Sequence, residues 1–150
     1  MKLDAEYEID RICRAIGLQV RTTLRKQGAV VAVSGGIDSS VCAALCARAL
    51  GKGHVLALAL PERHSSSAAG TLAQELCGAL GIELITISIE GVLDAAGCYK
   101  SQAEAMQQAF PEYRIGDPFK IVLPSLLAGE RLNVPRVTWH PHGGKEQTAR

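Results

Sequence analysis

Three short apolar runs alternate with helical segments, and this alternation is the feature that most constrains the fold. The runs occupy residues 29–33, 55–60 and 83–89, and helical patterns cover about residues 39–50 and 68–80. Strand, helix, strand, helix and strand at these lengths predict right-handed βαβ crossovers. We therefore expect an α/β fold with a doubly wound parallel sheet. The β-branched run 29–33 is typical of a strand buried on both faces of such a sheet.

Weaker patterns flank this core on both sides. Residues 4–27 have an amphipathic helical period, and shorter helical stretches cover 92–96 and 101–110. Five of the six prolines follow Phe110. The remaining predicted elements are strands at 120–123 and 133–140, a hairpin turn at 142–145 and a return strand from 146 that the chain's end cuts short. We predict a nucleotide-binding core over 1–110 and a Pro-rich extension or partial hairpin insertion, truncated, over 111–150.

Composition excludes several classes of partner. Sixteen Lys and Arg balance fifteen Asp and Glu, giving a net charge of +1, and no basic block is present. We therefore expect neither nucleic acid nor a membrane as a partner. No apolar run reaches the roughly 18 residues of a membrane span, and the N-terminus lacks a signal pattern, so we expect a cytoplasmic protein. The five cysteines match no zinc or C-x-x-C spacing and are interpreted as structural thiols in a reducing compartment.

A glycine- and serine-rich loop lies directly between the first predicted strand and the next helix. It reads Ser34-Gly35-Gly36-Ile37-Asp38-Ser39-Ser40. Ligands of open α/β sheets bind beyond the carboxyl ends of the strands. A turn that opens a helix there presents unpaired backbone N–H groups and the positive end of the helix dipole. Together with the serine hydroxyls, these groups predict a phosphate-binding site.

Asp38 distinguishes this loop from the common nucleotide-binding loops. Neither G-x-x-x-x-G-K-[ST] nor G-x-G-x-x-G is present. A bare carboxylate would repel a polyphosphate, so we expect Asp38 to bind Mg²⁺ that bridges to the phosphates. The structural alternative is that Asp38 is only a first-turn acid and the two glycines only a tight turn.

The loop resembles the S-G-G-x-D-S pyrophosphate loop of the ATP pyrophosphatase superfamily, whose fold is the Rossmann-like adenine nucleotide α-hydrolase fold. The resemblance implies cleavage of ATP between its α- and β-phosphates, adenylation of the substrate and release of pyrophosphate. NAD synthases, GMP synthetases and tRNA-modifying enzymes are members of this superfamily.

Further segments are similar to NAD synthases in particular. Residues 60–66 resemble their M-P-x-R-x-S-S stretch and residues 76–82 their A-x-x-L-G-I segment, with a weaker likeness from 120 to 139. The resemblance implies that Leu58 and Leu60 contact adenine. For Arg63, a contact to phosphate or ribose and an exposed loop position both stay open, and His64 is equally ambiguous. His140 and His142 are expected to face solvent, and Trp139 to serve packing or an interface.

The implied reaction has two steps. The carboxylate of nicotinate adenine dinucleotide attacks Mg-ATP to give an acyl-adenylate, and ammonia then displaces AMP to give NAD. No glutaminase unit precedes the loop, so the resemblance is to the ammonia-dependent carbon–nitrogen ligases, and it implies a homodimer.

Two alternatives stay open. A tRNA-modifying relative would bring paired cysteines and a basic surface. A catalytically incompetent ATP-binding fragment would lack the family's later N-K-S-E type segment, which is absent before Arg150. We therefore expect the 150-residue chain to be inactive on its own, as the N-terminal portion of an incomplete fold.

Overall fold

The computed structural model describes residues 4–123, 135–141 and 144–149. The chain forms two compact units, Met1–Gly91 and Val92–Arg150. The sequence placed the boundary after residue 110 instead. The difference arises because Met106, Phe110 and Tyr113 pack into the core of the second unit.

The first unit follows the predicted alternation closely. Its elements in chain order are α1 (Ala5–Leu18), η1 (Gln19–Thr23), β1 (Ala29–Ala32), α2 (Ile37–Leu50), η2 (Lys52–His54), β2 (Val55–Ala59), α3 (Ser67–Leu80) and β3 (Glu83–Thr86). The predicted helix over 4–27 is therefore two elements, because the hydrogen bonding changes to a π-helical turn after Leu18. The Asp4 carboxylate caps α1 by accepting the Tyr7 N–H at 3.1 Å.

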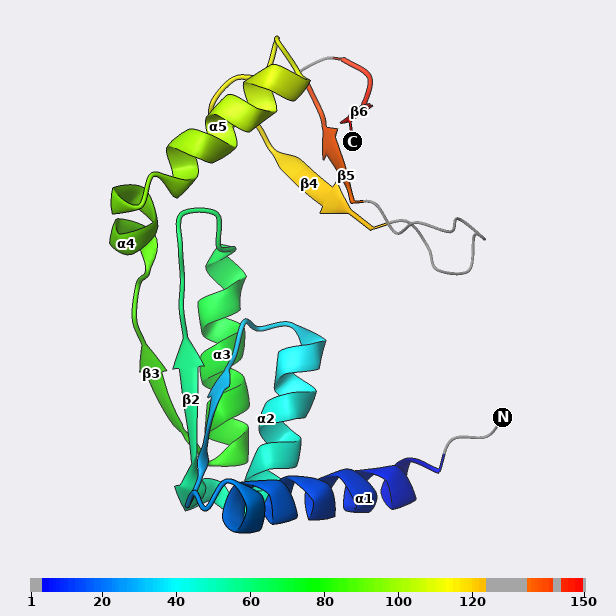
Figure 1. Cartoon of the computed structure of the whole chain (residues 1–150), viewed down its shortest axis with the longest axis vertical. Helices are drawn as coiled ribbons and strands as arrows, with labels where there is room; N and C mark the ends of the chain where they lie inside the picture. The colour runs from blue at the N-terminus through cyan, green and yellow to red at the C-terminus, as the bar shows by residue number, and fades with distance from the viewer. Residues whose placement is uncertain (1–3, 124–134, 142–143, 150) are drawn as a thin grey trace. The chain divides into compact units, whose positions relative to one another are not determined.

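The three strands form a parallel sheet in the order β1-β2-β3 (Figure 1). The side chains that β2 contributes to the core, Val55, Ala57 and Ala59, pack with residues of both α2 and α3. Both helices thus cover the same face of the sheet, because two right-handed crossovers that advance in one direction return on one side. The core is built from small and medium aliphatic side chains, which permit close helix–sheet packing.

The opposite face of this sheet is open among the described residues. Val30 in β1 is 65% exposed and Ile85 in β3 is 37% exposed. The prediction that the strand at 29–33 is buried on both faces is therefore wrong for Val30, since no described helix covers its side.

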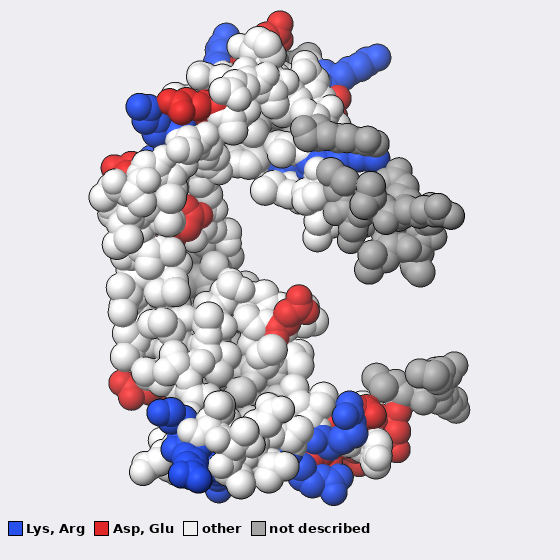
Figure 2. All heavy atoms as spheres, in the orientation of Figure 1, with Lys and Arg blue, Asp and Glu red and all other residues white. Residues whose placement is uncertain are grey.

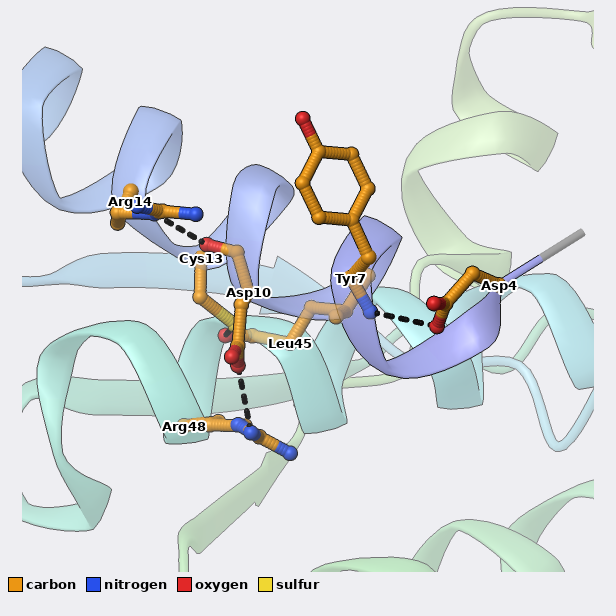
Figure 3. Close-up of polar contacts among 7 residues, drawn as sticks. All are labelled: Asp4, Tyr7, Asp10, Cys13, Arg14, Leu45 and Arg48. Carbon is orange, nitrogen blue, oxygen red and sulfur yellow. Dashed lines mark hydrogen bonds and ion pairs between the residues drawn. The ribbon is translucent and has the colours of Figure 1, made fainter.

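Polar contacts join helix α1 to α2 (Figure 3). An Nη atom of Arg48 lies 2.7 Å from Oδ1 of Asp10, and the Cys13 thiol lies 3.6 Å from the Leu45 carbonyl oxygen. Figure 2 shows Lys and Arg side chains gathered where α1 lies, while the surface over the strands carries few charges. No described helix is long and apolar enough to span a membrane.

The second unit combines helices with an antiparallel sheet of order β4-β5-β6. The remaining elements are α4 (Glu90–Ala95), which begins in the first unit, α5 (Cys98–Ala109), β4 (Phe119–Val122), β5 (Arg136–Trp139) and β6 (Gln147–Ala149). The predicted return strand is confirmed as β6, which pairs with β5. Residues 133–134 of one predicted strand, His142 and Arg150 lie outside the described residues.

Trp139 is the centre of the second unit's core. It is 1% exposed and packs with Phe110, Tyr113 and Met106. Its indole N–H donates to Oδ2 of Asp117 at 3.2 Å, which satisfies the buried donor. The expected packing role of Trp139 is confirmed.

Candidate functional site

The predicted phosphate loop lies where the sequence placed it, between the end of β1 and the start of α2. Val33 is 4% exposed, and its N–H donates to the Leu58 carbonyl at 3.0 Å, so parallel pairing continues past β1. The chain then turns sharply and enters α2 at Ile37. The loop therefore leaves the sheet at the carboxyl end of a strand, the usual ligand-binding edge of an α/β sheet.

The two glycines have different structural roles. Gly35 has a φ of +75°, and a Cβ there would lie 3.0 Å from the Ala69 carbonyl oxygen and 3.1 Å from Leu72 Cβ. Both the left-handed backbone and the contact with α3 thus require glycine. Gly36 is the N-cap of α2 with an ordinary φ of −82°.

The loop serines bond mainly to the loop itself. Ser39 Oγ accepts the Ser34 N–H at 3.2 Å and donates to the Gly36 carbonyl at 3.0 Å. The Ser40 hydroxyl donates to the same carbonyl at 2.8 Å. No side chain caps α2, so its opening amides keep no acceptor among the described residues. These amides, together with the helix dipole, are the loop's available donors for an anion.

Asp38 lies in the first turn of α2 with an exposed side chain, and Ile37 before it is 79% exposed. The Asp38 carboxylate has no hydrogen bond to another described residue. The described part of the chain contains no group of three or more His, Cys, Asp or Glu that could hold a metal ion by itself. A single carboxylate beside uncapped helix amides fits Mg²⁺, because protein-bound Mg²⁺ commonly takes one or two carboxylates and completes its shell with phosphate oxygens and water.

A pocket of about 530 Å³ lies at the carboxyl ends of the strands. It brings together four predicted site residues: Ser34 and Ser39 from the loop, and Leu58 and Leu60 from the end of β2. Gly35, Gly36, Ile37, Asp38 and Ser40 are not among its lining residues. The pocket thus joins the phosphate loop to the predicted adenine contacts.

The pocket also contains residues to which the sequence assigned no role. They include Ser65, Ser66, Ala69 and Gly70 around the start of α3, and Thr86 at the end of β3. The two serines belong to the segment that resembles P-x-R-x-S-S, which was a signal for their placement. Thr86 had no such signal beyond its position at a strand end.

Arg63 does not line this pocket. Its Nε lies 3.0 Å from Oε1 of Glu90, and both side chains are about half exposed, at 45% and 46%. Nearby, the His64 N–H donates to the Glu62 carboxylate at 3.0 Å, and the Glu62 N–H donates to Ser65 Oγ at 2.9 Å. The segment after β2 is thus held by local hydrogen bonds.

His140 and the five cysteines show no arrangement that indicates a catalytic or metal-binding role among the described residues. His140 is exposed, as expected, and lies 3.4 Å from Glu146. All five cysteines are unpaired. Burial raises the pKa of the Cys46 and Cys77 thiols, which keeps them protonated and poorly nucleophilic near neutral pH.

Comparison with known proteins identifies the family. The family model for NAD synthase matches residues 8–115. A Mesorhizobium japonicum protein named NH(3)-dependent NAD(+) synthetase is 43% identical over 150 residues, covering 100% of this chain and 47% of that protein. A Rhizobium rhizogenes protein of the same name is 42% identical over 130 residues, covering 87% of this chain and 39% of that protein.

Solved structures agree with the sequence comparisons. The structure of the NH3-dependent NAD synthetase from Campylobacter jejuni, in complex with nitrate ion, is similar with a TM-score of 0.59 and 36% sequence identity. The match covers 65% of this chain and 42% of that one. The chain spans about half the length, or less, of these relatives. With the parallel sheet, the loop and these matches together, the chain belongs to the NAD synthase family.

Proposed function

We propose that this chain supplies the ATP-binding part of an ammonia-dependent NAD synthetase. The observation that carries the proposal is the uncapped start of α2, with Asp38 in its first turn, beside a pocket that ends at Leu58 and Leu60. The relatives' names support the reaction class. In that reaction ATP adenylates nicotinate adenine dinucleotide, pyrophosphate leaves, and ammonia forms the amide of NAD.

The proposed chemistry assigns distinct tasks to the loop. The opening amides of α2 and its dipole hold the phosphates and stabilise the negative charge that develops as pyrophosphate leaves. Asp38 would hold Mg²⁺, which neutralises phosphate charge when bound. The serine bonds within the loop fix its shape before ATP arrives, so less ordering is needed on binding. Leu58 and Leu60 provide the apolar surface for the base.

The proposal extends to assembly and location. We propose that the full-length protein is a homodimer, as the resemblance to NAD synthases implies, and that it is cytoplasmic, as its composition predicts. Five unpaired cysteines are consistent with a reducing compartment. A tRNA-modifying function is not favoured, because the described residues hold no cysteine cluster and the named relatives are NAD synthetases.

Asp38→Asn tests the metal and phosphate roles directly. We expect this change to weaken Mg-ATP binding by about ten- to a hundredfold, because it removes a charged ligand worth about 1.5–3 kcal/mol. Titration calorimetry with and without Mg²⁺ measures the effect, and circular dichroism checks that the fold is kept. Asp10→Asn is the matched control, since it removes the same charge from α1 outside the loop. Equal ATP affinity and Mg²⁺ dependence in Asp38→Asn would contradict the role of Asp38.

Turnover is tested separately with ATP, Mg²⁺, nicotinate adenine dinucleotide and ammonium, scored for AMP and pyrophosphate. We expect the 150-residue chain to bind ATP without sustained turnover. Robust turnover by this chain would show that it carries the whole catalytic machinery and not only the ATP-binding part.

A further inference from the structure

Thr86 ends β3 and lines the pocket at the strand ends. Its register partner on β2 is Ala59, so its side chain lies on the helix-covered face of the sheet, where Ala69 and Gly70 of α3 also line the pocket. Since the sheet order is β1-β2-β3, the phosphate loop follows one outer strand and Thr86 ends the other. Two strand spacings of about 4.8 Å separate them, or roughly 10 Å. That span is comparable to the reach of an adenosine from its phosphate end to the far edge of its base.

Some hydroxyl groups of the pocket already form hydrogen bonds within the chain, and others do not. Those of Ser34, Ser39 and Ser65 form hydrogen bonds to neighbouring loop atoms. Those of Ser66 and Thr86 have no hydrogen-bond partner among the described residues. Ser66 is the N-cap of α3, the helix against which Gly35 of the phosphate loop packs. Thr86 is therefore the unbonded hydroxyl on the side away from the loop.

We propose that the Thr86 hydroxyl accepts a hydrogen bond from the exocyclic amino group of the bound adenine. This inference rests on the proposed function, which places the phosphates at α2 and the base in the pocket that Leu58 and Leu60 help to line. In that orientation the edge of the base opposite the sugar points toward β3. That edge carries the 6-amino donor, and Thr86 is the pocket residue at β3 with a side-chain acceptor. Thr86 is thus a specificity residue for the base.

Thr86→Val removes the hydroxyl while keeping a β-branched side chain at a strand end, so the fold is expected to persist. Titration calorimetry on the 150-residue chain should show ATP binding weakened roughly five- to tenfold. Thr86→Ser, which retains a hydroxyl, should bind ATP within about twofold of the unchanged chain. The control is Thr71→Val, the same substitution at an exposed position of α3 outside the pocket lining.

Two further ligands separate base recognition from phosphate binding. The triphosphate of purine riboside lacks the 6-amino group, so Thr86→Val should not change its affinity. Tripolyphosphate, which lacks base and sugar, should bind all variants equally. The inference is overturned if Thr86→Val leaves ATP affinity unchanged, or weakens both nucleotides alike. If the unchanged chain fails to bind ATP at all, the proposed function itself is overturned, which is a distinguishable result.

Discussion

The two units bury their sheets in different ways. The parallel sheet of Met1–Gly91 packs two helices on one face through small aliphatic side chains and leaves the other face open. The antiparallel sheet of the second unit packs around aromatic rings, with four of the chain's six aromatic residues in or against its core. The pocket of the first unit forms at the ends of its strands, beside the starts of α2 and α3. The aromatic core instead concentrates its stability in a few large side chains.

Trp139→Ala should produce the largest effect, because it removes the most buried large side chain of the second unit. Its ring lies 5.5 Å from Phe110 and 5.9 Å from Tyr113, centroid to centroid, and its N–H bonds to Asp117. We expect a loss of about 3–5 kcal/mol in the free energy of unfolding of that unit. Hydrogen exchange should show lost protection in β4 and β5 while β2 stays protected. Trp139→Phe serves as the milder control, and equal loss of protection in β2 would contradict independent cores.

Ala57→Leu tests the close packing of the first unit, and its expected effect on the free energy of unfolding is smaller than that of Trp139→Ala. Ala57 is fully buried on the helix-covered face, so a larger side chain should cost about 1–3 kcal/mol. Val30→Leu on the open face is the comparison, with an expected change within about 0.5 kcal/mol. Chemical denaturation of both variants measures the difference. Similar costs at the two positions would show that both faces of the sheet are packed.

The smallest expected effect is a loss of stability at alkaline pH, which should occur in the first unit and not in the second. Burial raises the pKa of Cys46 and Cys77 in the first unit above the ordinary value of 9.0. Their contribution to stability is complete below that value and is lost as the pH rises through the raised pKa, because the unfolded thiols ionise first. Cys98 in the second unit is exposed and has no comparable burial. Hydrogen exchange between pH 8 and 11 should show this loss in the first unit, reduced in a Cys46→Ala, Cys77→Ala double variant.

Much of the fold was predictable because its signals are local. Apolar runs, helical periods and glycine stops located β1, α2, β2 and α3 to within a few residues, and the last turn signal located the β5–β6 hairpin. The boundary at Gly91 was not predictable in this way. It depends on Phe110 and Tyr113 packing with Trp139, residues that are far apart in the sequence.

In the candidate site, too, some features follow from neighbouring residues and others depend on distant segments packing together. Residues 34–40 could be recognised because a strand, a glycine turn and a helix start follow one another along the chain. Thr86 could not, since its place beside Ala59 in the pocket depends on the register of β3 against β2. Arg63 was a candidate by motif, and only the structure revealed its ion pair with Glu90.

The sequence by itself determined the alternation of strands and helices, the position of the glycine- and serine-rich loop at 34–40 and the family, because backbone propensity and short motifs are properties of neighbouring residues. The tertiary structure decided which face of the sheet is covered, which hydroxyls are already bonded and which side chains share the pocket. These depend on crossover handedness, strand order and register, which arise only when distant segments pack together.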